Sequence, residues 1–260
     1  MAPNLLSRLF RKPAPAAAPS AAGRLVYAVG DVHGHNPTLH ALLDIIRTDL
    51  AAQPHDRKPL LIFLGDYVDR GPDSAGVIQT VLDLMAEGTF EVRALKGNHE
   101  EALLDFLSDP AFGATWSDYG GNTTLASYGV QPPVSRTDVE AWIAARDAFA
   151  RALPQDHLAL LNRLELMVEL GDFAFVHAGV RPGVSLANQT ERDLLWIRQE
   201  FLQATGRFEK LIVHGHTPME EPQISSIRMG LDTGVYATGI LTAARIDDRG
   251  YKILQARRPN

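Results

Sequence analysis

The sequence predicts an α/β fold in which central mixed β-sheets are flanked by helices. Two observations support this class. Apolar runs at residues 25–29 and 60–64 and a third expected strand at 91–95 alternate with segments at 38–50 and 74–85, whose apolar residues recur at helical spacing. Residues 240–246 and 251–254 then resemble antiparallel strands. The opening order, βαβαβ, predicts a largely parallel sheet covered by helices on both faces.

Each of the three opening runs stops at a glycine followed by a polar residue. These pairs are Gly-Asp at 30–31, Gly-Asp at 65–66 and Gly-Asn at 97–98. In sheets of this kind ligands collect beyond the carboxyl ends of the strands. We therefore expect a binding site at that edge of the sheet.

The remaining segments fit one domain, at residues 24–257. Residues 101–162 contain helical and loop-forming stretches, which we interpret as an insertion packed beside the sheet. Strands are expected at 166–170, 173–176 and 211–213, with a helix at about 191–203. A chain of 260 residues, 45% hydrophobic, can bury the core that such a domain requires.

Composition limits the chemistry. The net charge of -6 gives no electrostatic reason to expect nucleic-acid binding. The chain has no cysteine, so any metal site must use imidazole, carboxylate and amide groups. A lack of cysteine also agrees with a cytoplasmic location. No apolar run approaches the roughly 20 residues of a membrane span, so stable membrane insertion is not expected.

The first 23 residues differ from the rest. Their Pro/Ala-rich part, 13–23, predicts a disordered tail whose removal, over residues 1–22, leaves catalysis intact. A second interpretation is a weak contact with a membrane or partner, made by an apolar and basic segment. That segment contains Leu5, Leu6, Leu9 and Phe10, flanked by Arg8, Arg11 and Lys12.

Five strand ends carry a glycine-rich turn with a potential metal ligand. In order they are GDVHG (30–34), GDYVDRG (65–71), GNHE (97–100), HAG (177–179) and GHT (215–217). Glycine permits a sharp turn and a close backbone approach. A single such turn is common in structural roles, but five in succession predict one shared metal centre.

These five turns resemble, in spelling and order, the phosphoprotein phosphatase branch of the calcineurin-like metallophosphoesterases, and the bacterial and phage serine/threonine phosphatases within it. The match runs from Gly30 to Thr217, and GDYVDRG with GNHE is specific to this branch. Most of the 101–162 insertion is not covered. The resemblance implies an α+β sandwich and hydrolysis of phosphate esters by a metal-activated water.

The resemblance also implies two divalent metal ions, with manganese favoured and iron, zinc or nickel as alternatives. The implied ligands are Asp31 and His33 for one metal, Asp66 as the bridge, and Asn98, His177 and His216 for the other. His214 competes with His216, but the family places the ligand between Gly and Thr. An imidazole must be neutral to bind a metal, so binding should weaken as pH falls.

The remaining motif residues are implied to handle the substrate. His99 would be the general acid and Asp69 would orient it, while Arg70 would bind phosphate oxygens. A second phosphate-binding arginine is expected after the fourth motif. Arg198 is the first candidate, and Arg181 and Arg192 are alternatives. Asn98 and Tyr236 are expected to border the substrate.

The motifs bear on four possible functions. A serine/threonine protein phosphatase is favoured by the resemblance, with Asp69 counting against its main alternative, a small-molecule phosphohydrolase such as diadenosine tetraphosphatase. Net acidity, and Pro218 where other metallophosphoesterases carry a second histidine, disfavour a nuclease. The retained ligands disfavour a non-catalytic binding module. The expected partner is thus a phosphorylated protein or a small phosphate ester.

Overall fold

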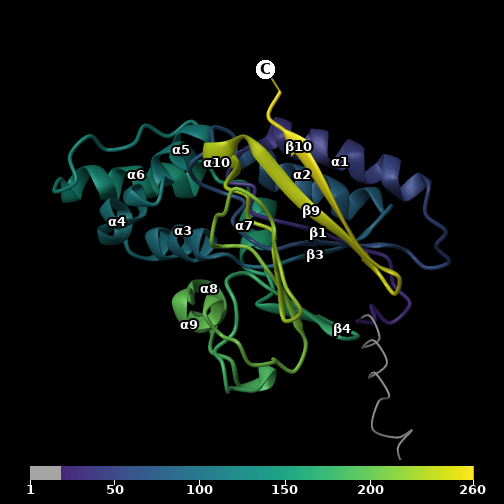
Figure 1. The fold of residues 1–260 in the computed structure, drawn as a ribbon. Helices are drawn as coiled ribbons and strands as arrows, with labels where there is room; N and C mark the ends of the chain where they lie inside the picture. Colours follow the sequence, from purple (N-terminus) through teal and green to yellow (C-terminus); the bar gives the residue numbers. More distant parts are fainter. Residues whose placement is uncertain (1–18, 260) are drawn as a thin grey trace, which may run out of the picture.

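Two five-stranded β-sheets face each other, with helices on both outer sides (Figure 1). The computed structural model describes residues 19–259. The first sheet has the order β10-β9-β1-β2-β3, formed by β1 (Val26–Val29), β2 (Leu60–Phe63), β3 (Glu91–Ala94), β9 (Ile240–Asp247) and β10 (Gly250–Arg257). The second has the order β4-β5-β6-β8-β7, formed by β4 (Met167–Leu170), β5 (Phe173–Val176), β6 (Leu211–His214), β7 (Gln223–Ile224) and β8 (Arg228–Gly230). The predicted mixed sheets flanked by helices are confirmed.

The opening of the chain forms the predicted βαβαβ unit. β1, β2 and β3 are parallel, and helices α1 (Asn36–Ala51) and α2 (Ser74–Glu87) connect them. β9 then joins the free side of β1 in the antiparallel sense and pairs with β10 along its whole length. β1 therefore lies in the centre of its sheet and is buried throughout.

The second sheet contains the strands that precede the other two motif turns. β5, β6 and β8 are parallel, and β4 and β7 pair antiparallel at the two edges. The sequence motifs did not assign the five turns to particular sheets. Three of the turns follow strands of the first sheet and two follow strands of the second, so the site forms where two sheets meet.

Alternating side chains divide the interior into layers. Val26 and Ala28 of β1 face the second sheet and contribute to the core between the sheets, together with Phe175 and Val213. Tyr27 and Val29 lie on the opposite face of the same strand and belong to the core beneath the helices. The period of two in side-chain direction explains this division.

Between β3 and β4 the chain is helical. Its helices are α3 (Asn98–Ser108), α4 (Gly113–Asp118), α5 (Gly121–Ser127), α6 (Val139–Ala152) and α7 (Gln155–Leu161). An aromatic cluster packs α3, α4 and α6 together, and it contains Phe106, Trp116, Trp142 and Phe149. This cluster belongs to the same core as α1 and α2, so the segment packs as part of the domain.

The start of the domain lies earlier than the predicted boundary at residue 24. Residues 20–23, assigned to the tail from composition, contact both sheets. The backbone N–H of Ser20 donates to the side-chain carboxylate of Asp172, at the β4–β5 turn, and the backbone N–H of Asp172 donates to Ser20 O. Asp248 in the β9–β10 turn accepts from the backbone of Ala21 and Gly23. Ala21 is fully buried between the sheets. Residues 1–18, including Leu5 to Lys12, lie outside the described part of the chain.

Within residues 19–259, none of the helices has the length and apolar character that crossing a membrane requires.

Candidate dinuclear metal centre

The five predicted turns bring their ligands to one place. Asp31, Asp66 and Asn98 follow β1, β2 and β3, while His177 and His216 follow β5 and β6. All of these side chains are buried. Their common location follows from parallel strands, whose carboxyl ends meet at the same edge of each sheet.

Asp66 lies at the middle of the centre. It belongs to two groups of possible metal ligands, one with His33 and His99 and one with His177 and His216, and within each group the ligand atoms lie within 4.8 Å of one another. Its Oδ2 is 3.6 Å from His33 Nε2, and its Oδ1 is 3.4 Å from His177 Nε2. Because its two oxygens face different histidines, Asp66 fits the bridging position.

Asn98 joins the second group through its side-chain oxygen. Oδ1 lies 3.0 Å from His177 Nε2 and 2.8 Å from His216 Nδ1. An amide oxygen and two imidazole nitrogens so close together form a donor set that suits a divalent transition metal.

Asp31 shows most clearly that the centre fits a cation. Its Oδ2 accepts a hydrogen bond from the backbone of His216, whereas its Oδ1 is buried without a hydrogen-bond partner in the described structure. A Cβ at Gly215 would lie only 1.9 Å from that Oδ1, so glycine is needed there. Burial, together with Asp232 and Asp66 nearby, holds the pKa of Asp31 well above its usual range. A bound cation would relieve this repulsion.

The expected ligand histidines are kept neutral by their surroundings. Burial lowers the pKa of His33 and of His177, and it lowers the pKa of His216 to about 2, with further repulsion from His177 in the last case. Backbone carbonyls fix two of the rings, since His33 Nδ1 lies 2.9 Å from Val68 O and His177 Nδ1 lies 2.8 Å from Leu64 O. Each of these rings therefore points its Nε2 into the centre.

His99 has a different environment although it is close enough to be a ligand. Its Nδ1 lies 2.7 Å from Asp69 Oδ2, and its Nε2 lies 3.3 Å from the Arg70 guanidinium. Burial opposes the charged imidazole, but Asp66 and Asp69 outweigh burial and raise the pKa of His99. A charged imidazole cannot bind a metal, so this geometry suits a proton donor.

The helical segment supports Asp69, a contribution that the sequence analysis missed. Trp116 Nε1 donates to Asp69 Oδ2 at 2.9 Å, and Thr124 Oγ1 donates to Oδ1 at 2.6 Å. Both residues lie in the part of the chain that no motif covers. No sequence signal connected them to the site, because the contact depends on how α4 and α5 pack.

Glu100 is a second residue whose role the sequence analysis did not identify. Its buried carboxylate accepts hydrogen bonds from the backbone of Asp66, Tyr67, Val68 and Gly97 at 2.8–3.3 Å. It thereby connects the second turn to the third. Its place in GNHE was the available signal, since an acidic residue inside a ligand motif needs an explanation.

Left-handed backbone conformations cluster at the centre. Among the described non-glycine residues with positive φ, all but Ala22 belong to the motifs: His33, Asp66, Asp69, Arg70 and His216. This conformation is costly for residues with a side chain. The surrounding fold therefore holds these side chains in positions that the isolated chain would avoid.

Arg198 contacts the centre directly. The predicted helix at 191–203 is interrupted, because α8 (Glu191–Trp196) ends before Ile197 and α9 (Gln199–Leu202) starts after Arg198. At this break Ile197 enters the core while Arg198 Nε donates to His216 Nε2 at 3.0 Å. His216 Nε2 accepts this hydrogen bond, so the proton of the neutral imidazole lies on His216 Nδ1. A metal on Nδ1 would require that proton to move and would release Arg198.

The other predicted residues are placed as follows. The Arg70 guanidinium lies 4.2 Å from the ring centroid of Tyr236, on α10 (Val235–Thr238), and that ring contacts His33. Arg181 is paired with Asp193 instead of entering the site. His214 packs on Phe201, and its Nδ1 contacts Gly215 O.

Comparison with known proteins agrees with this arrangement. The sequence model of the calcineurin-like phosphoesterases matches residues 25–239. The chain belongs to the calcineurin-like phosphoesterase family. As a member, it is a metal-dependent phosphoesterase, and the predicted resemblance is confirmed.

Relatives within this phosphoesterase family carry different activities in their names. The chain is 27% identical to the asymmetrical bis(5'-nucleosyl)-tetraphosphatase PrpE of Halalkalibacterium halodurans, over 89% of this chain and 94% of the relative. It is 28% identical to serine/threonine-protein phosphatase 1 of Salmonella typhimurium, over 86% and 92%. The crystal structure of a candidate diadenosine tetraphosphatase shares the fold, with a TM-score of 0.60 and 19% identity over 92% and 97%.

Proposed function

We propose that this phosphoesterase hydrolyses dinucleoside tetraphosphates asymmetrically, releasing a nucleoside triphosphate and a nucleoside monophosphate. The sequence analysis placed a protein phosphatase first, and the proposal reverses that order. PrpE of Halalkalibacterium halodurans and a second PrpE from Anoxybacillus flavithermus match 89% and 84% of the chain.

Aromatic side chains around the metal centre are the observation that carries this proposal. Tyr119 packs against His99 at a ring-centroid distance of 6.1 Å, and Trp196 packs against both Tyr119 and His216 at 5.9 and 6.3 Å. Both are partly exposed. Tyr236 lies on the Arg70 side of the centre. Such rings offer stacking surfaces for a nucleobase next to the groups that would bind its phosphates.

The first group of residues in the proposed reaction would hold the metal ions. We assign one metal ion to Asp31, His33 and Asp66, and the other to Asp66, Asn98, His177 and His216. Two divalent cations there would polarise the phosphate and lower the pKa of a water molecule. Manganese is our first choice, and iron, zinc and nickel are alternatives that the same nitrogen and oxygen ligands accept.

A second group of side chains would transfer a proton and bind the phosphate. His99, held by Asp69, would donate its proton to the leaving phosphate oxygen as the bond to phosphorus breaks. Arg70 and Arg198 would bind non-bridging phosphate oxygens. The two products together contain the atoms of the substrate and of one water molecule. The hydroxyl group of that water becomes bonded to one phosphorus, and the proton of the water is released.

A serine/threonine protein phosphatase is the second candidate. The Salmonella relative supports it, at 28% identity, close to the 27% and 28% of the two PrpE relatives named above. The ion pair of His99 with Asp69, together with Arg70, suits a phosphomonoester as well as an anhydride. The chemistry at phosphorus is shared, so substrate binding must distinguish the two functions.

The test compares both substrates on one preparation. Metal-stripped protein with added Mn²⁺ is incubated with diadenosine tetraphosphate, and products are separated by chromatography. A phosphothreonine peptide is assayed in parallel. We expect ATP and AMP in equal amounts, at a kcat/KM at least 100-fold above that for the peptide. Two molecules of ADP per substrate, or a faster reaction with the peptide, would reject the proposal.

Matched variants identify the source of the activity. Asp66→Asn removes the bridging carboxylate, and we expect it to abolish turnover of both substrates. Asp83→Asn makes the same chemical change on the exposed side of α2 and should behave as the parent. Residual turnover by Asp66→Asn at the parent rate would point to a contaminating enzyme.

A further inference from the structure

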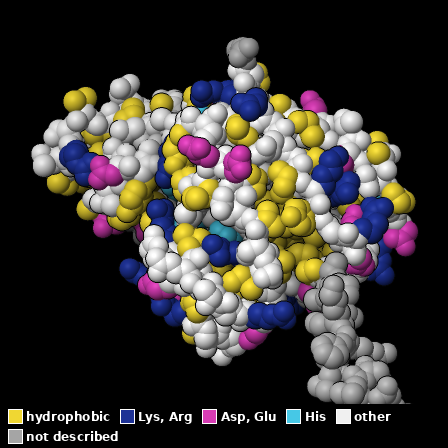
Figure 2. Space-filling view, viewed as in Figure 1, with side chains coloured by type: hydrophobic (Ala, Val, Ile, Leu, Met, Phe, Trp, Pro, Cys, Tyr) yellow, Lys and Arg dark blue, Asp and Glu magenta, His cyan; other side chains and the backbone are white. Residues whose placement is uncertain are grey.

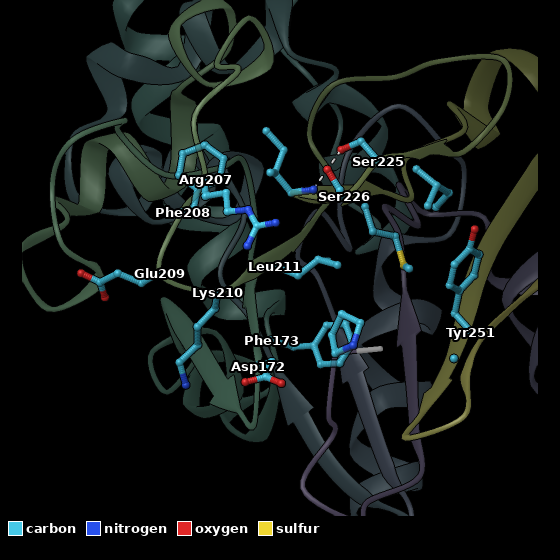
Figure 3. Close-up of a pocket in the computed structure, with 15 residues that line it drawn as sticks. Asp172, Phe173, Arg207, Phe208, Glu209, Lys210, Leu211, Ser225, Ser226 and Tyr251 are labelled. Carbon is cyan, nitrogen blue, oxygen red and sulfur yellow. Dashed lines mark hydrogen bonds between the residues drawn. The ribbon is translucent and has the colours of Figure 1, made fainter. Parts of the chain in front are cut away.

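A groove at the opposite end of the molecule from the metal centre has no role in the proposed reaction (Figure 3). Its volume is about 490 Å³. Apolar side chains from both sheets line it, with the first described residue at its rim: Pro19, Phe173, Leu211, Ile224, Met229 and Tyr251. We refer to it as the sheet-end groove.

Its position follows from the direction of the strands. Phe173 and Leu211 are the first residues of β5 and β6, whereas His177 and His216 follow the last residues of the same strands. Across a four-residue strand the two ends are about 13 Å apart. The sheet-end groove and the metal centre therefore occupy opposite ends of the second sheet.

The sheet-end groove is apolar, and the charged side chains that line it sum to zero net charge. Tyr251 is 52% exposed, and Figure 2 shows hydrophobic side chains gathered beside the β9–β10 hairpin. Lys210 at the rim is paired with Glu169 at 3.0 Å. Among the lining residues, the two acids, Asp172 and Glu209, are matched by the two bases, Arg207 and Lys210. An apolar occupant therefore fits better than a charged one.

We propose that the chain's own N-terminal segment, residues 5–10, docks in the sheet-end groove. Pro19 lines the groove, so the preceding 18 residues continue from its rim. They include Leu5, Leu6, Leu9 and Phe10, four large apolar side chains close together in the sequence. A groove of this volume accommodates several such side chains.

The connecting residues are long enough for this return. Eight residues, 11–18, separate Phe10 from Pro19, and nine peptide steps reach at most about 30 Å. Such a tether gives an effective concentration on the order of 1 mM. An intrinsic dissociation constant of about 0.1 mM would then keep the groove roughly nine-tenths occupied.

Disulfide trapping tests the proposal directly because the chain has no cysteine of its own. Phe10→Cys is combined with Ser226→Cys, which lies in the groove, and oxidised by glutathione disulfide. The control pair combines Phe10→Cys with Thr205→Cys, on an exposed loop next to Arg207 but outside the groove. We expect intramolecular disulfide formation at least 10-fold faster in the groove pair, at a rate independent of protein concentration.

Two further results test whether residues 5–10 occupy the sheet-end groove. Adding Leu5→Asp and Leu9→Asp to the groove pair should reduce its rate to that of the control pair, without altering any residue of the folded domain. Equal rates in the groove and control pairs would overturn the proposal. Disulfide-linked dimers that increase with protein concentration would overturn it too, since the occupant would then be a second copy.

The catalytic assay separates this proposal from the proposed function. Because the groove lies away from the metal centre, deletion of residues 1–18 should leave kcat for any accepted phosphate ester within twofold of the parent. The trapping result depends on no substrate, so it stands or falls independently of the proposed activity.

Discussion

His33 and His99 lie side by side, with ring centroids 4.6 Å apart, yet their surroundings shift their pKa values in opposite directions. Burial lowers the pKa of His33, whose Nδ1 faces only a backbone carbonyl. Burial also opposes charge on His99, but Asp66 and Asp69 raise its pKa overall. The opposite shifts fit the roles proposed for these two imidazoles, a metal ligand for His33 and an acid for His99.

Replacing the acid should slow turnover without removing the metal. We predict that His99→Asn lowers kcat by roughly 100- to 10,000-fold, the range that acid catalysis contributes. Its metal content, measured by mass spectrometry of the purified protein, should equal that of the parent. The loss should shrink with a good leaving group such as p-nitrophenolate. An equal loss for good and poor leaving groups would show that His99 does not protonate the leaving oxygen.

The pH profile tests the partner of this acid. A raised pKa keeps His99 protonated above its ordinary value of 6.5, and the acid is lost as pH rises through the raised value. Asp69→Asn removes one of the charges that raise it. We therefore predict that the alkaline limb of kcat moves to lower pH in Asp69→Asn. A profile that keeps its alkaline limb would assign that limb to another group.

At this scale the sequence reveals candidate ligands better than it reveals what holds them. Asp66 and His177 could be named as candidates because their motifs state the residue type and the spacing, and the structure brings them together. The four backbone hydrogen bonds to Glu100 could not be anticipated, since they depend on two turns approaching each other. The left-handed conformation of Asp66 is likewise set by neighbours distant in sequence.

Among the elements, α4 and α5 matter because they complete the surroundings of Asp69. We predict that Trp116→Phe reduces kcat about 10-fold, the equivalent of one buried hydrogen bond worth about 1.4 kcal/mol. Trp142→Phe is a matched control, because Trp142 lies in the same aromatic cluster and its Nε1 has no partner within the described structure. Both variants should lose stability, but only Trp116→Phe should lose activity. An equal loss of kcat in both would assign the effect to packing.

A second element-scale prediction concerns α1. Asp49, near its end, accepts hydrogen bonds from Tyr27 of β1, Arg245 of β9 and Lys252 of β10. Burial raises its pKa, but these partners outweigh burial and lower the pKa overall. Asp49→Ala would leave the buried Tyr27 hydroxyl unpaired, and we expect a loss of about 2–4 kcal/mol in the free energy of unfolding, measured with urea. Asp44→Ala, on the exposed side of α1, should change it by less than about 0.5 kcal/mol.

Element types were easier to predict than their partners. The alternation of apolar runs and amphipathic segments gave the βαβαβ unit, because side-chain period depends on local structure alone. Non-local contacts could not be predicted in this way. The sequence did not indicate which strands share a sheet, so the pairing of the strands before His177 and His216 in a separate sheet was not anticipated. The single helix predicted at 191–203 is wrong because it breaks at Arg198, where burial of Ile197 and the contact with His216 outweigh helical continuity.

In the whole molecule, residues 20–23 connect the two sheets at the end away from the metal centre. We predict that deletion of residues 1–22 lowers the free energy of unfolding by about 3 kcal/mol relative to deletion of residues 1–18. This is the sum expected for the hydrogen bonds that Ser20 forms with Asp172 and Ala21 forms with Asp248, together with the burial of Ala21. Equal urea midpoints for the two deletions would contradict this account.

The order β10-β9-β1-β2-β3 has a consequence for how the protein is made. On the ribosome, β1 emerges first and can join β2 early, but its other partner, β9, is synthesised more than 200 residues later. Until then the apolar strand Val26–Val29 has an open edge, which is a template for pairing with other chains. Nascent or C-terminally truncated chains that lack β9 and β10 should therefore be the forms that aggregate or recruit chaperones.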